Sequence, residues 1–139
     1  MSSMEALVGL ALWSVALTFV LVGVRMSAGK ELNSFKPDGN DLSNFGLRVT
    51  RAHANCLENL ALPAAIILIA MVQGQTAIIT QTAIITDGLA LVFLVSRIGQ
   101  SLVHMLFTQS VPIVIVRATL FTVQHVIIII WGLELLGIT

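Results

Sequence analysis

Long apolar segments without formal charge are the feature that most constrains how this chain can fold. Ala6 to Val24 is one such run of 19 residues. As an α-helix it would be ~28 Å long, close to the ~30 Å thickness of a bilayer's hydrocarbon core. Only 10% of the 139 residues are charged and the mean hydropathy is +0.98, whereas soluble domains carry about 25% charged residues. We therefore expect lipid rather than water to surround most of this protein.

The pattern of charges divides the chain into four predicted spans, at about 6–25, 50–73, 84–107 and 112–136. A polar segment at about 26–49, rich in Gly, Asn and Ser, separates the first two spans. Because the uncharged stretch between Glu58 and Asp87 is too long for one helix alone, it requires a turn, which we place near Gly74. The sequence therefore predicts an all-α membrane protein, a single domain built as a bundle of four transmembrane helices.

Two residues refine this prediction. Pro63 lies inside the second span, where a proline is expected to kink the helix. Asp87 lies near the predicted outer end of the third span, where the helix dipole would favour a carboxylate. We expect Asp87 to be a helix-start residue.

The distribution of basic residues predicts the orientation. Five of them lie in or beside the first loop, whereas the second loop and the two termini contain none: Arg25, Lys30, Lys36, Arg48 and Arg51. The positive-inside rule places that loop in the cytoplasm and both termini on the opposite side. A cleaved signal peptide would instead carry basic residues before its apolar run, but here Glu5 precedes the run and Arg25 follows it.

Polar residues inside the spans form stripes at helical spacing. Intervals of three and four residues place side chains on one face of a helix, and three sets follow this rule. They are Arg51, Asn55 and Glu58 in the second span, Arg97, Ser101 and His104 in the third, and Arg117, Phe121 and Gln124 in the fourth. Charged groups in hydrocarbon are costly and are normally retained because they pair or line a cavity.

These stripes converge on one half of the membrane. Counting from the cytoplasmic end of each helix places Glu58 ~10 Å deep, His104 ~5 Å, Arg97 ~15 Å and Arg117 ~8 Å. Such convergence favours a pocket that opens to the cytoplasm and binds an anion, because the arginines outnumber the one buried carboxylate. The alternative is purely structural. Glu58 would then neutralise Arg97 or Arg117 between helices, and the other arginines would reach up to water at the interface.

The stripe Arg51-Ala-His-Ala-Asn55-Cys-Leu-Glu58, at the start of the second of four spans, resembles the signature of the MAPEG superfamily. These are the membrane-associated proteins in eicosanoid and glutathione metabolism, which include the microsomal glutathione transferases. The resemblance extends over nearly the whole chain, in span lengths, orientation and the polar first loop. It implies a homotrimer of four-helix subunits that binds glutathione between neighbouring subunits.

The resemblance also implies roles for individual residues. Arg51, Asn55 and Glu58 match residues that hold glutathione, with Glu58 suited to its ammonium group. Arg25 and Arg97 resemble family arginines on the first and third spans, and we add Ser101 to this predicted binding set. Arg117 corresponds most nearly to the arginine that stabilises the glutathione thiolate. Several arginines and one glutamate suit glutathione, which has two carboxylates and one ammonium.

If the chain is an enzyme, we expect a glutathione transferase or peroxidase acting on lipophilic electrophiles that approach from the lipid. Arg117 is the predicted thiolate-stabilising residue, because a nearby cation raises the thiolate fraction. His104 is the predicted supporting donor or proton carrier, since histidine titrates near neutrality. Ser101 is an alternative donor to His104.

One departure from the family keeps other functions open. The family usually has tyrosines near the positions of His104 and Phe121, and this chain has no tyrosine. The separation of His104 and Arg117 is also longer than in the eicosanoid enzymes. The alternatives are a non-catalytic membrane protein that binds an anionic lipid or thiol ligand, and a small proton-coupled exporter in which Glu58 is the coupling carboxylate.

Other classes of site receive little support from the sequence. A formal charge of zero argues against nucleic acid as a partner. By the depth count His125 lies ~20 Å from the cytoplasmic end, far from His53 and His104, so the histidines do not suggest a metal site. Cys56 faces away from the Arg51 stripe and is expected to be a packing residue. The expected partners are membrane lipid, glutathione, a lipophilic substrate and further copies of the chain.

Overall fold

The computed structural model describes residues 1–31, 34–73 and 81–138. Within the last range, only the backbone of residues 81–86 is described. The turn predicted near Gly74 lies outside these residues. The described chain forms five helices: α1 (Ser3–Ser27), α2 (Asn44–Glu58), α3 (Ala61–Val72), α4 (Gln81–Leu106) and α5 (Val111–Leu135). Within the described ranges there is no strand. The predicted all-α class is confirmed.

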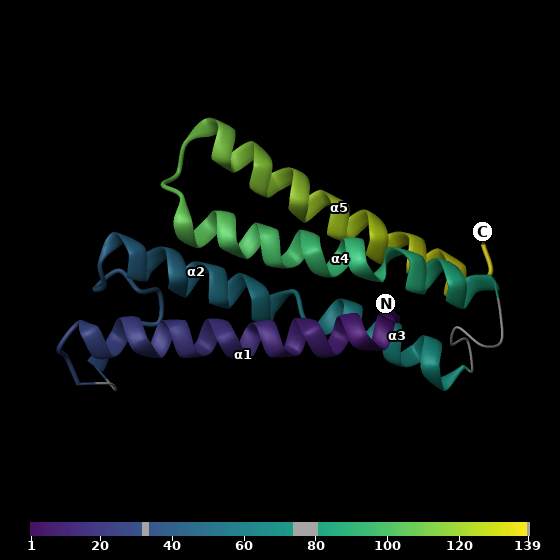
Figure 1. The fold of residues 1–139 in the computed structure, drawn as a ribbon, viewed down its shortest axis with the longest axis horizontal. Helices are drawn as coiled ribbons and strands as arrows, with labels where there is room; N and C mark the ends of the chain where they lie inside the picture. The colour runs from purple at the N-terminus through teal and green to yellow at the C-terminus, as the bar shows by residue number, and fades with distance from the viewer. Residues whose placement is uncertain (32–33, 74–80, 139) are drawn as a thin grey trace.

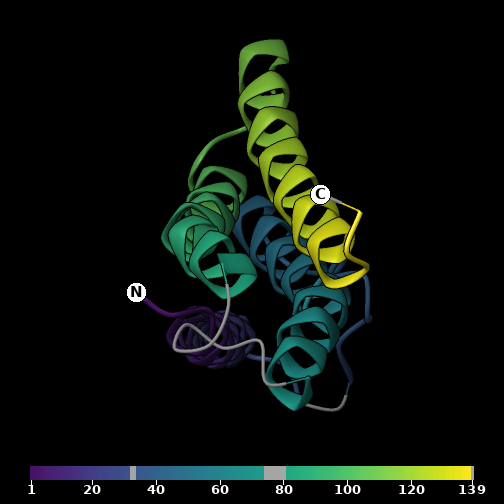
Figure 2. The same cartoon turned by 90° about the vertical axis from the view of Figure 1, so that its right-hand side faces the viewer.

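Among the described residues, four segments are long and apolar enough to cross a membrane: Ser3–Ser27, Asn44–Val72, Asp87–Leu106 and Val111–Leu135. They run roughly along one axis, and α1 begins at the end of the bundle where α5 finishes (Figure 1). Viewed along this axis, α1, α4 and α5 form separate rods beside the paired α2 and α3 (Figure 2). We call the end of the bundle where α1 begins and α5 finishes the terminal end. The opposite end, with the first loop and the α4–α5 connection, we call the loop end.

The second span is broken where Pro63 predicts a kink. The helix α2 ends at Glu58, and α3 begins at Ala61. A proline at position 63 has no N–H with which to bond the carbonyl of Asn59, four residues earlier. Helical bonding resumes with Ala64, whose N–H donates to the carbonyl of Leu60 at 3.2 Å. The second span is therefore two helices in sequence, which can follow different directions.

The helix α4 lies at the centre of the bundle, because it packs against α1, α2 and α5. Close packing against α1 depends on Gly9, where an added Cβ would lie 2.8 Å from Leu94. At the terminal end α5 also packs against α3, and the rings of Phe93 and Trp131 meet there with centroids 5.4 Å apart. Toward the loop end α5 diverges from α4 (Figure 1).

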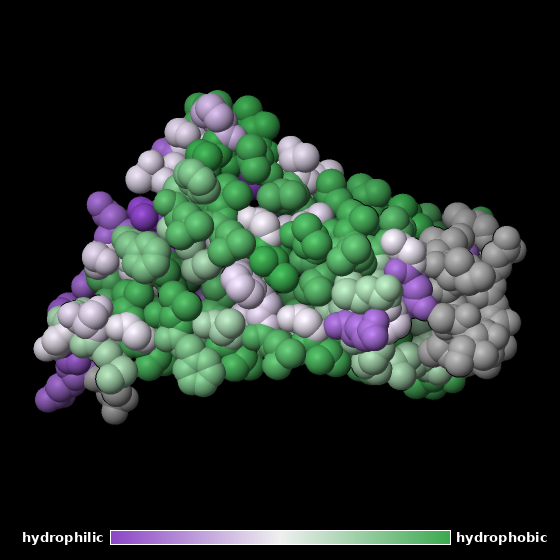
Figure 3. Space-filling model, viewed as in Figure 1, coloured by the Kyte–Doolittle hydropathy of each residue, from purple (hydrophilic) through white to green (hydrophobic). Residues whose placement is uncertain are grey.

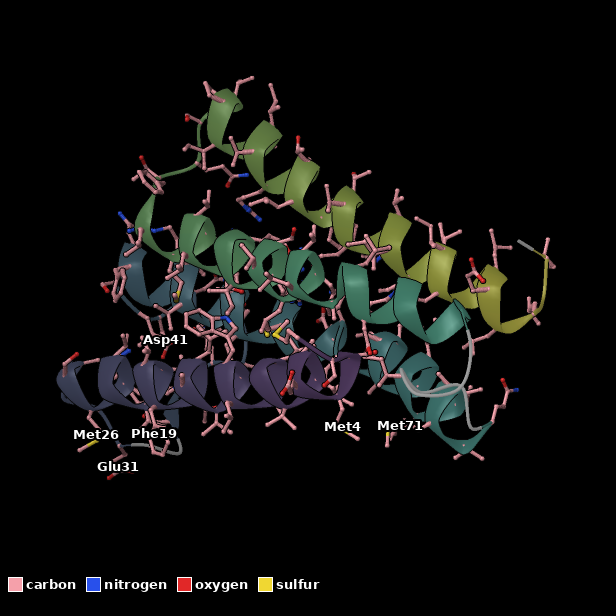
Figure 4. The ribbon with its side chains drawn as sticks, turned by 45° about the vertical axis from the view of Figure 1, so that its right-hand side comes forward. Met4, Phe19, Met26, Glu31, Asp41 and Met71 are labelled. Carbon is pink, nitrogen blue, oxygen red and sulfur yellow. The ribbon has the colours of Figure 1, made fainter. Side chains whose placement is uncertain are left out.

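The surface is largely apolar, as a membrane protein requires (Figure 3). Phe19 is 72% exposed and Met26 is 64% exposed, and both point away from the other helices (Figure 4). Hydrophilic surface gathers mainly at the loop end, with a smaller patch near the N-terminus (Figure 3). Lipid can therefore surround the middle of the bundle while both ends contact water.

Asp87 has a different role from the one predicted. Because α4 begins at Gln81 rather than beside Asp87, this carboxylate does not lie in the first turn of its own helix. Its Oδ1 accepts hydrogen bonds from the backbone N–H of Ser3 at 2.8 Å and from the Ser3 hydroxyl at 2.6 Å. The carboxylate thus stabilises the N-terminus of a neighbouring helix, α1, where the dipole also favours a negative charge.

The first loop is held by Asp41. Its Oδ2 lies 3.5 Å from the Lys30 ammonium, and its Oδ1 accepts from the backbone N–H of Lys36 at 3.2 Å. Desolvation raises the pKa of Asp41, but hydrogen bonds from the backbone of Asp41 and Lys36, together with Lys30, leave its pKa below the usual value. The loop packs onto α2 at Gly39, where φ is +73° and an added Cβ would lie 2.6 Å from the Thr50 hydroxyl.

A polar network lies inside the bundle, on the loop-end side of Trp131. Arg97, only 1% exposed, donates through Nη1 to the side-chain oxygens of Gln100 at 3.0 Å and Gln124 at 3.2 Å, and through Nη2 to the carbonyl of Asn55. Gln124 donates to Gln100 at 3.1 Å and to the carbonyl of Leu120 at 2.9 Å. The network joins α2, α4 and α5 through one guanidinium.

We expect the substitution Gly39→Ala to destabilise the fold by about 1–3 kcal/mol, because it combines a strained positive φ with a clash against Thr50. Thermal unfolding in detergent measures the effect. The control is Gly23→Ala, since nothing lies within 4 Å of an added Cβ at that helical position and alanine favours helix. Equal stability of Gly39→Ala and the parent would contradict the described packing of the loop on α2.

We expect Gln124→Leu to lower the free energy of unfolding by about 1.5–3 kcal/mol, because it removes an acceptor from a buried charged group. Thermal unfolding again measures the change. The control is Thr119→Val on the same helix, since the exposed Thr119 hydroxyl bonds only to the carbonyl of Ile115. If both variants are as stable as the parent, the network does not hold α5 to α4.

Candidate functional site

The predicted stripe on the second span lies along one side of α2. This helix begins after Ser43, whose hydroxyl accepts from the N–H of Gly46 at 3.2 Å and so caps it. Arg51 and Glu58 are exposed, and Asn55 is half-buried. Exposed charges on a membrane span are costly if lipid surrounds them. This side of α2 therefore requires a contact other than hydrocarbon.

A cleft of about 270 Å³ opens between α2, α4 and α5. Its lining is polar toward α2 and α4 and includes both polar and apolar groups on α5. The lining residues are Asn55, Gln100, Gln109, Val114, Arg117, Ala118 and Phe121. Because α5 diverges from α4 toward the loop end (Figure 1), the cleft lies at the open part of the bundle. The structure thus brings together two predicted site residues, Asn55 and Arg117.

Positive charge gathers around this cleft. Arg51 and Arg117 lie close enough for their positive charges to repel each other. His104 is half-buried on α4 and lies close enough to feel the positive charges of Arg117, Arg51 and Arg48. Arg48 itself donates from Nε to the carbonyl of Met105 at 2.9 Å, near the C-terminal end of α4. Arginines from α2 and α5 therefore lie near one another, with His104 of α4 beside them.

These cations have no acidic partner within 4.0 Å in the described part of the subunit. Among the residues that the structure describes, the only ion pair within 4.0 Å joins Lys30 to Asp41 in the first loop. Glu58 accordingly pairs with neither Arg97 nor Arg117, so the structural alternative considered for Glu58 is not found within one subunit. The buried Nε of Arg117 also has no hydrogen-bond partner. The charges around the cleft are suited to an anion.

Arg97 and Ser101 lie behind the cleft rather than in its lining. The Ser101 hydroxyl donates to the carbonyl of Arg97 at 3.0 Å, and Arg97 is fully engaged with neutral acceptors except at Nε. Gln100 connects this pair to the cleft, because it lines the cleft and accepts from Arg97. Gln100 was not predicted as a site residue. The available signal was an amide three residues after an arginine in an apolar span.

Arg25 lies apart from the cleft within one subunit. Its guanidinium lies over the ring of Phe35, 5.6 Å from the centroid, near the end of α1. It is within electrostatic range of His53, whose Nε2 lies 3.0 Å from the Thr18 hydroxyl. This polar group belongs to the α1–α2 side of the bundle, whereas the cleft lies between α2 and α5.

Cys56 is a fully buried packing residue, with an exposed fraction of 0%. Its Sγ lies 3.3 Å from the Ser14 hydroxyl of α1. The thiol therefore faces the interface between α1 and α2.

One of three comparisons with known proteins identifies a family for this chain. The family model of the MAPEG family matches residues 4–137, nearly the whole chain. No curated protein and no solved structure gives a significant match. The family match includes every helix that contributes to the cleft, and the family prediction made from the second-span stripe is confirmed. This four-span membrane protein belongs to the MAPEG family.

Proposed function

We propose that the chain binds glutathione in the cleft and acts as a glutathione transferase or peroxidase on lipophilic electrophiles. The observation that carries this proposal is the cluster of guanidinium groups around the cleft without a carboxylate partner in the described chain. Glutathione has two carboxylates, one ammonium group and one thiol, so several arginines and one glutamate complement it. Membership of a family in glutathione and eicosanoid metabolism supports the same ligand.

The residues of the cleft have distinct roles in this proposal. Arg51 binds a ligand carboxylate, Asn55 hydrogen-bonds the peptide backbone, and Glu58 binds the ammonium group. Arg97 and Ser101 support the site from behind, where Arg97 fixes the side chain of Gln100. Gln100 then contributes to the floor of the cleft.

Arg117 stabilises the thiolate, because a cation beside sulfur favours the ionised form. His104 takes up or returns the thiol proton. In a transfer reaction the sulfur forms a bond to an electrophilic carbon, and the leaving group departs with its bonding electrons. In reduction of a hydroperoxide the thiolate attacks the terminal oxygen and the O–O bond breaks, so that the sulfur becomes a sulfenic acid and the alkoxide leaves and takes up a proton to give the alcohol. A second glutathione then displaces the oxygen from sulfur, giving glutathione disulfide and water.

We also propose that the active form is a homotrimer with its loop end in the cytoplasm. Two observations support assembly: Arg51 and Glu58 are exposed on a membrane span, and Arg25 is remote from the cleft of its own subunit. A neighbouring copy would cover the side of α2 and add its own α1 side to the cleft. The basic first loop supports the orientation.

We expect Arg51→Gln to weaken glutathione binding at least about tenfold, because it removes a charge-assisted hydrogen bond to a ligand carboxylate. Calorimetric titration of the purified protein in lipid nanodiscs measures the affinity. Lys36→Gln is the matched control, since it removes one positive charge from the exposed first loop. Absence of glutathione binding to the parent protein at millimolar concentration would refute the proposed function.

We expect Arg117→Gln to lower the conjugation rate at neutral pH about 10²-fold, because less of the bound thiol is ionised. The pH at which the rate reaches half its maximum should rise by about one to two units. Arg117→Lys keeps the charge and should retain much of the parent's pH profile. Conjugation of a chlorinated aromatic substrate gives both measurements, and an unchanged profile in Arg117→Gln would contradict the role of Arg117.

One observation favours the second candidate, a protein that binds a thiol or anionic lipid without turnover. Phe121, which has no hydroxyl, lines the cleft beside Arg117, and the chain has no tyrosine to donate a hydrogen bond there. Binding of glutathione without conjugation or peroxidase activity would support this candidate. Transport that is lost in Glu58→Gln and does not respond to glutathione would support the exporter instead.

A further inference from the structure

A second hollow lies at the terminal end of the bundle, and it shares no lining residue with the cleft. It has a volume of about 110 Å³, and we call it the terminal hollow. Three segments that are far apart in the sequence form it. The lining residues are Ser2, Ser3 and Met4 at the start of α1, Ile67, Ala70 and Met71 on α3, and Asp87 on α4.

Two methionines line this hollow from different helices. Met4 lies in the first turn of α1, and Met71 lies near the end of α3. The two helices pack against each other, and the two side chains extend to the same side of the bundle (Figure 4). Each residue is 38% exposed. Both thioethers are therefore accessible from outside the protein.

The terminal hollow lies where three membrane-crossing segments end. These segments are Ser3–Ser27, Asn44–Val72 and Asp87–Leu106. The inner side of the hollow is apolar, because Ile67 and Ala70 are buried and lie on the same face of α3 as Met71. An ion can therefore enter from water at the end of the bundle, while buried side chains cover its inner side.

Asp87 is the one charged residue in this lining. Its Oδ1 accepts from the N–H and the hydroxyl of Ser3, and these are the hydrogen bonds that the described residues donate to this carboxylate. In the same part of the chain no cation lies within 4.0 Å of it. The lone pairs of Oδ2 are thus available to a ligand.

This set of donors is suited to a soft monovalent cation. Thioether sulfur is a soft ligand that favours Cu(I), whereas Mg²⁺ and Ca²⁺ require several oxygen ligands. The described chain contains no group of three or more His, Cys, Asp or Glu residues that could hold a metal ion. One carboxylate also neutralises one positive charge, whereas a divalent ion would leave an uncompensated charge beside buried apolar groups.

We propose that Met4 and Met71 bind Cu(I) in the terminal hollow, with Oδ2 of Asp87 as a third ligand. Methionine has three rotatable bonds, so both sulfurs can approach one ion within a space of this size. The bound ion would join α1, α3 and α4. This inference goes beyond the proposed function and does not depend on it, because the two sites have no residue in common.

Competition with bicinchoninate, which forms a coloured complex with Cu(I), measures the affinity of the detergent-purified protein. Ascorbate keeps the copper reduced, and glutathione is omitted. We expect the parent to take one equivalent of Cu(I) per chain from the chelator. Leucine has nearly the volume of methionine but no sulfur, so Met4→Leu and Met71→Leu should each weaken binding at least about tenfold.

Three further variants test the other parts of the proposal. Asp87→Asn retains an oxygen for Ser3 but loses the charge, and it should weaken binding about three- to tenfold. Met26→Leu is the matched control, because Met26 is an exposed methionine in the last turn of the same helix as Met4. Cys56→Ala removes the thiol, which is the other soft ligand. Both Met26→Leu and Cys56→Ala should bind Cu(I) as tightly as the parent.

X-ray absorption at the copper edge of the parent protein needs no substitution, and it should show two sulfur neighbours and one oxygen neighbour. Absence of competition by the parent overturns the inference, as does a spectrum with only oxygen or nitrogen neighbours. Full affinity in the double variant Met4→Leu/Met71→Leu overturns it too, and loss of binding in Cys56→Ala would assign the copper to the thiol instead. None of these results bears on glutathione binding in the cleft.

Discussion

A guanidinium buried among membrane helices determines much of this structure. A charge in a medium of low dielectric is costly unless its donors are satisfied. Both Nη atoms of Arg97 donate to neutral oxygens instead of a carboxylate, whereas its buried Nε has no partner. These oxygens belong to α2, α4 and α5. The arginine therefore fixes the relative positions of three helices, and it leaves the positive charge itself unneutralised within the subunit.

The bundle consequently has two different halves. At the terminal end, apolar packing of Phe93 on Trp131 and the tie between Ser3 and Asp87 hold the helices together. At the loop end α5 diverges from α4 (Figure 1), and the cleft lies between α2, α4 and α5. The network of Arg97 lies between the two halves. The packed terminal end thus supports an open site that contains Arg117.

Hydropathy and helical periodicity predicted the all-α class, because lipid imposes a length and an apolar composition on each span. The break at Pro63 was predictable for a similar reason, since the missing N–H is a local property. Asp87 was mispredicted because its partner, Ser3, lies 84 residues away along the chain and on another helix. A local sequence pattern does not indicate a contact between residues so far apart in the chain.

The site was only partly predictable. Spacing placed Arg97, Ser101 and His104 on one face, but it did not reveal how α4 is rotated against its neighbours. That rotation turns Arg97 inward and leaves Gln100 to line the cleft. The predicted roles of Arg25, Arg51 and Glu58 depend on surfaces that one subunit leaves exposed or apart from the cleft. In the proposed homotrimer a neighbouring copy would supply these contacts, and the helical spacing within one chain does not indicate them.

The end of α2 has a consequence for the position of charge in the membrane. A carbonyl oxygen has two lone pairs, so it can accept from its own helix and from a neighbouring helix at the same time. Asn55 lies in the last turn of α2, and its carbonyl accepts from the backbone N–H and the side-chain amide of Asn59 as well as from Arg97. The oxygen that closes the last turn of one helix therefore also holds a cation on the adjacent helix.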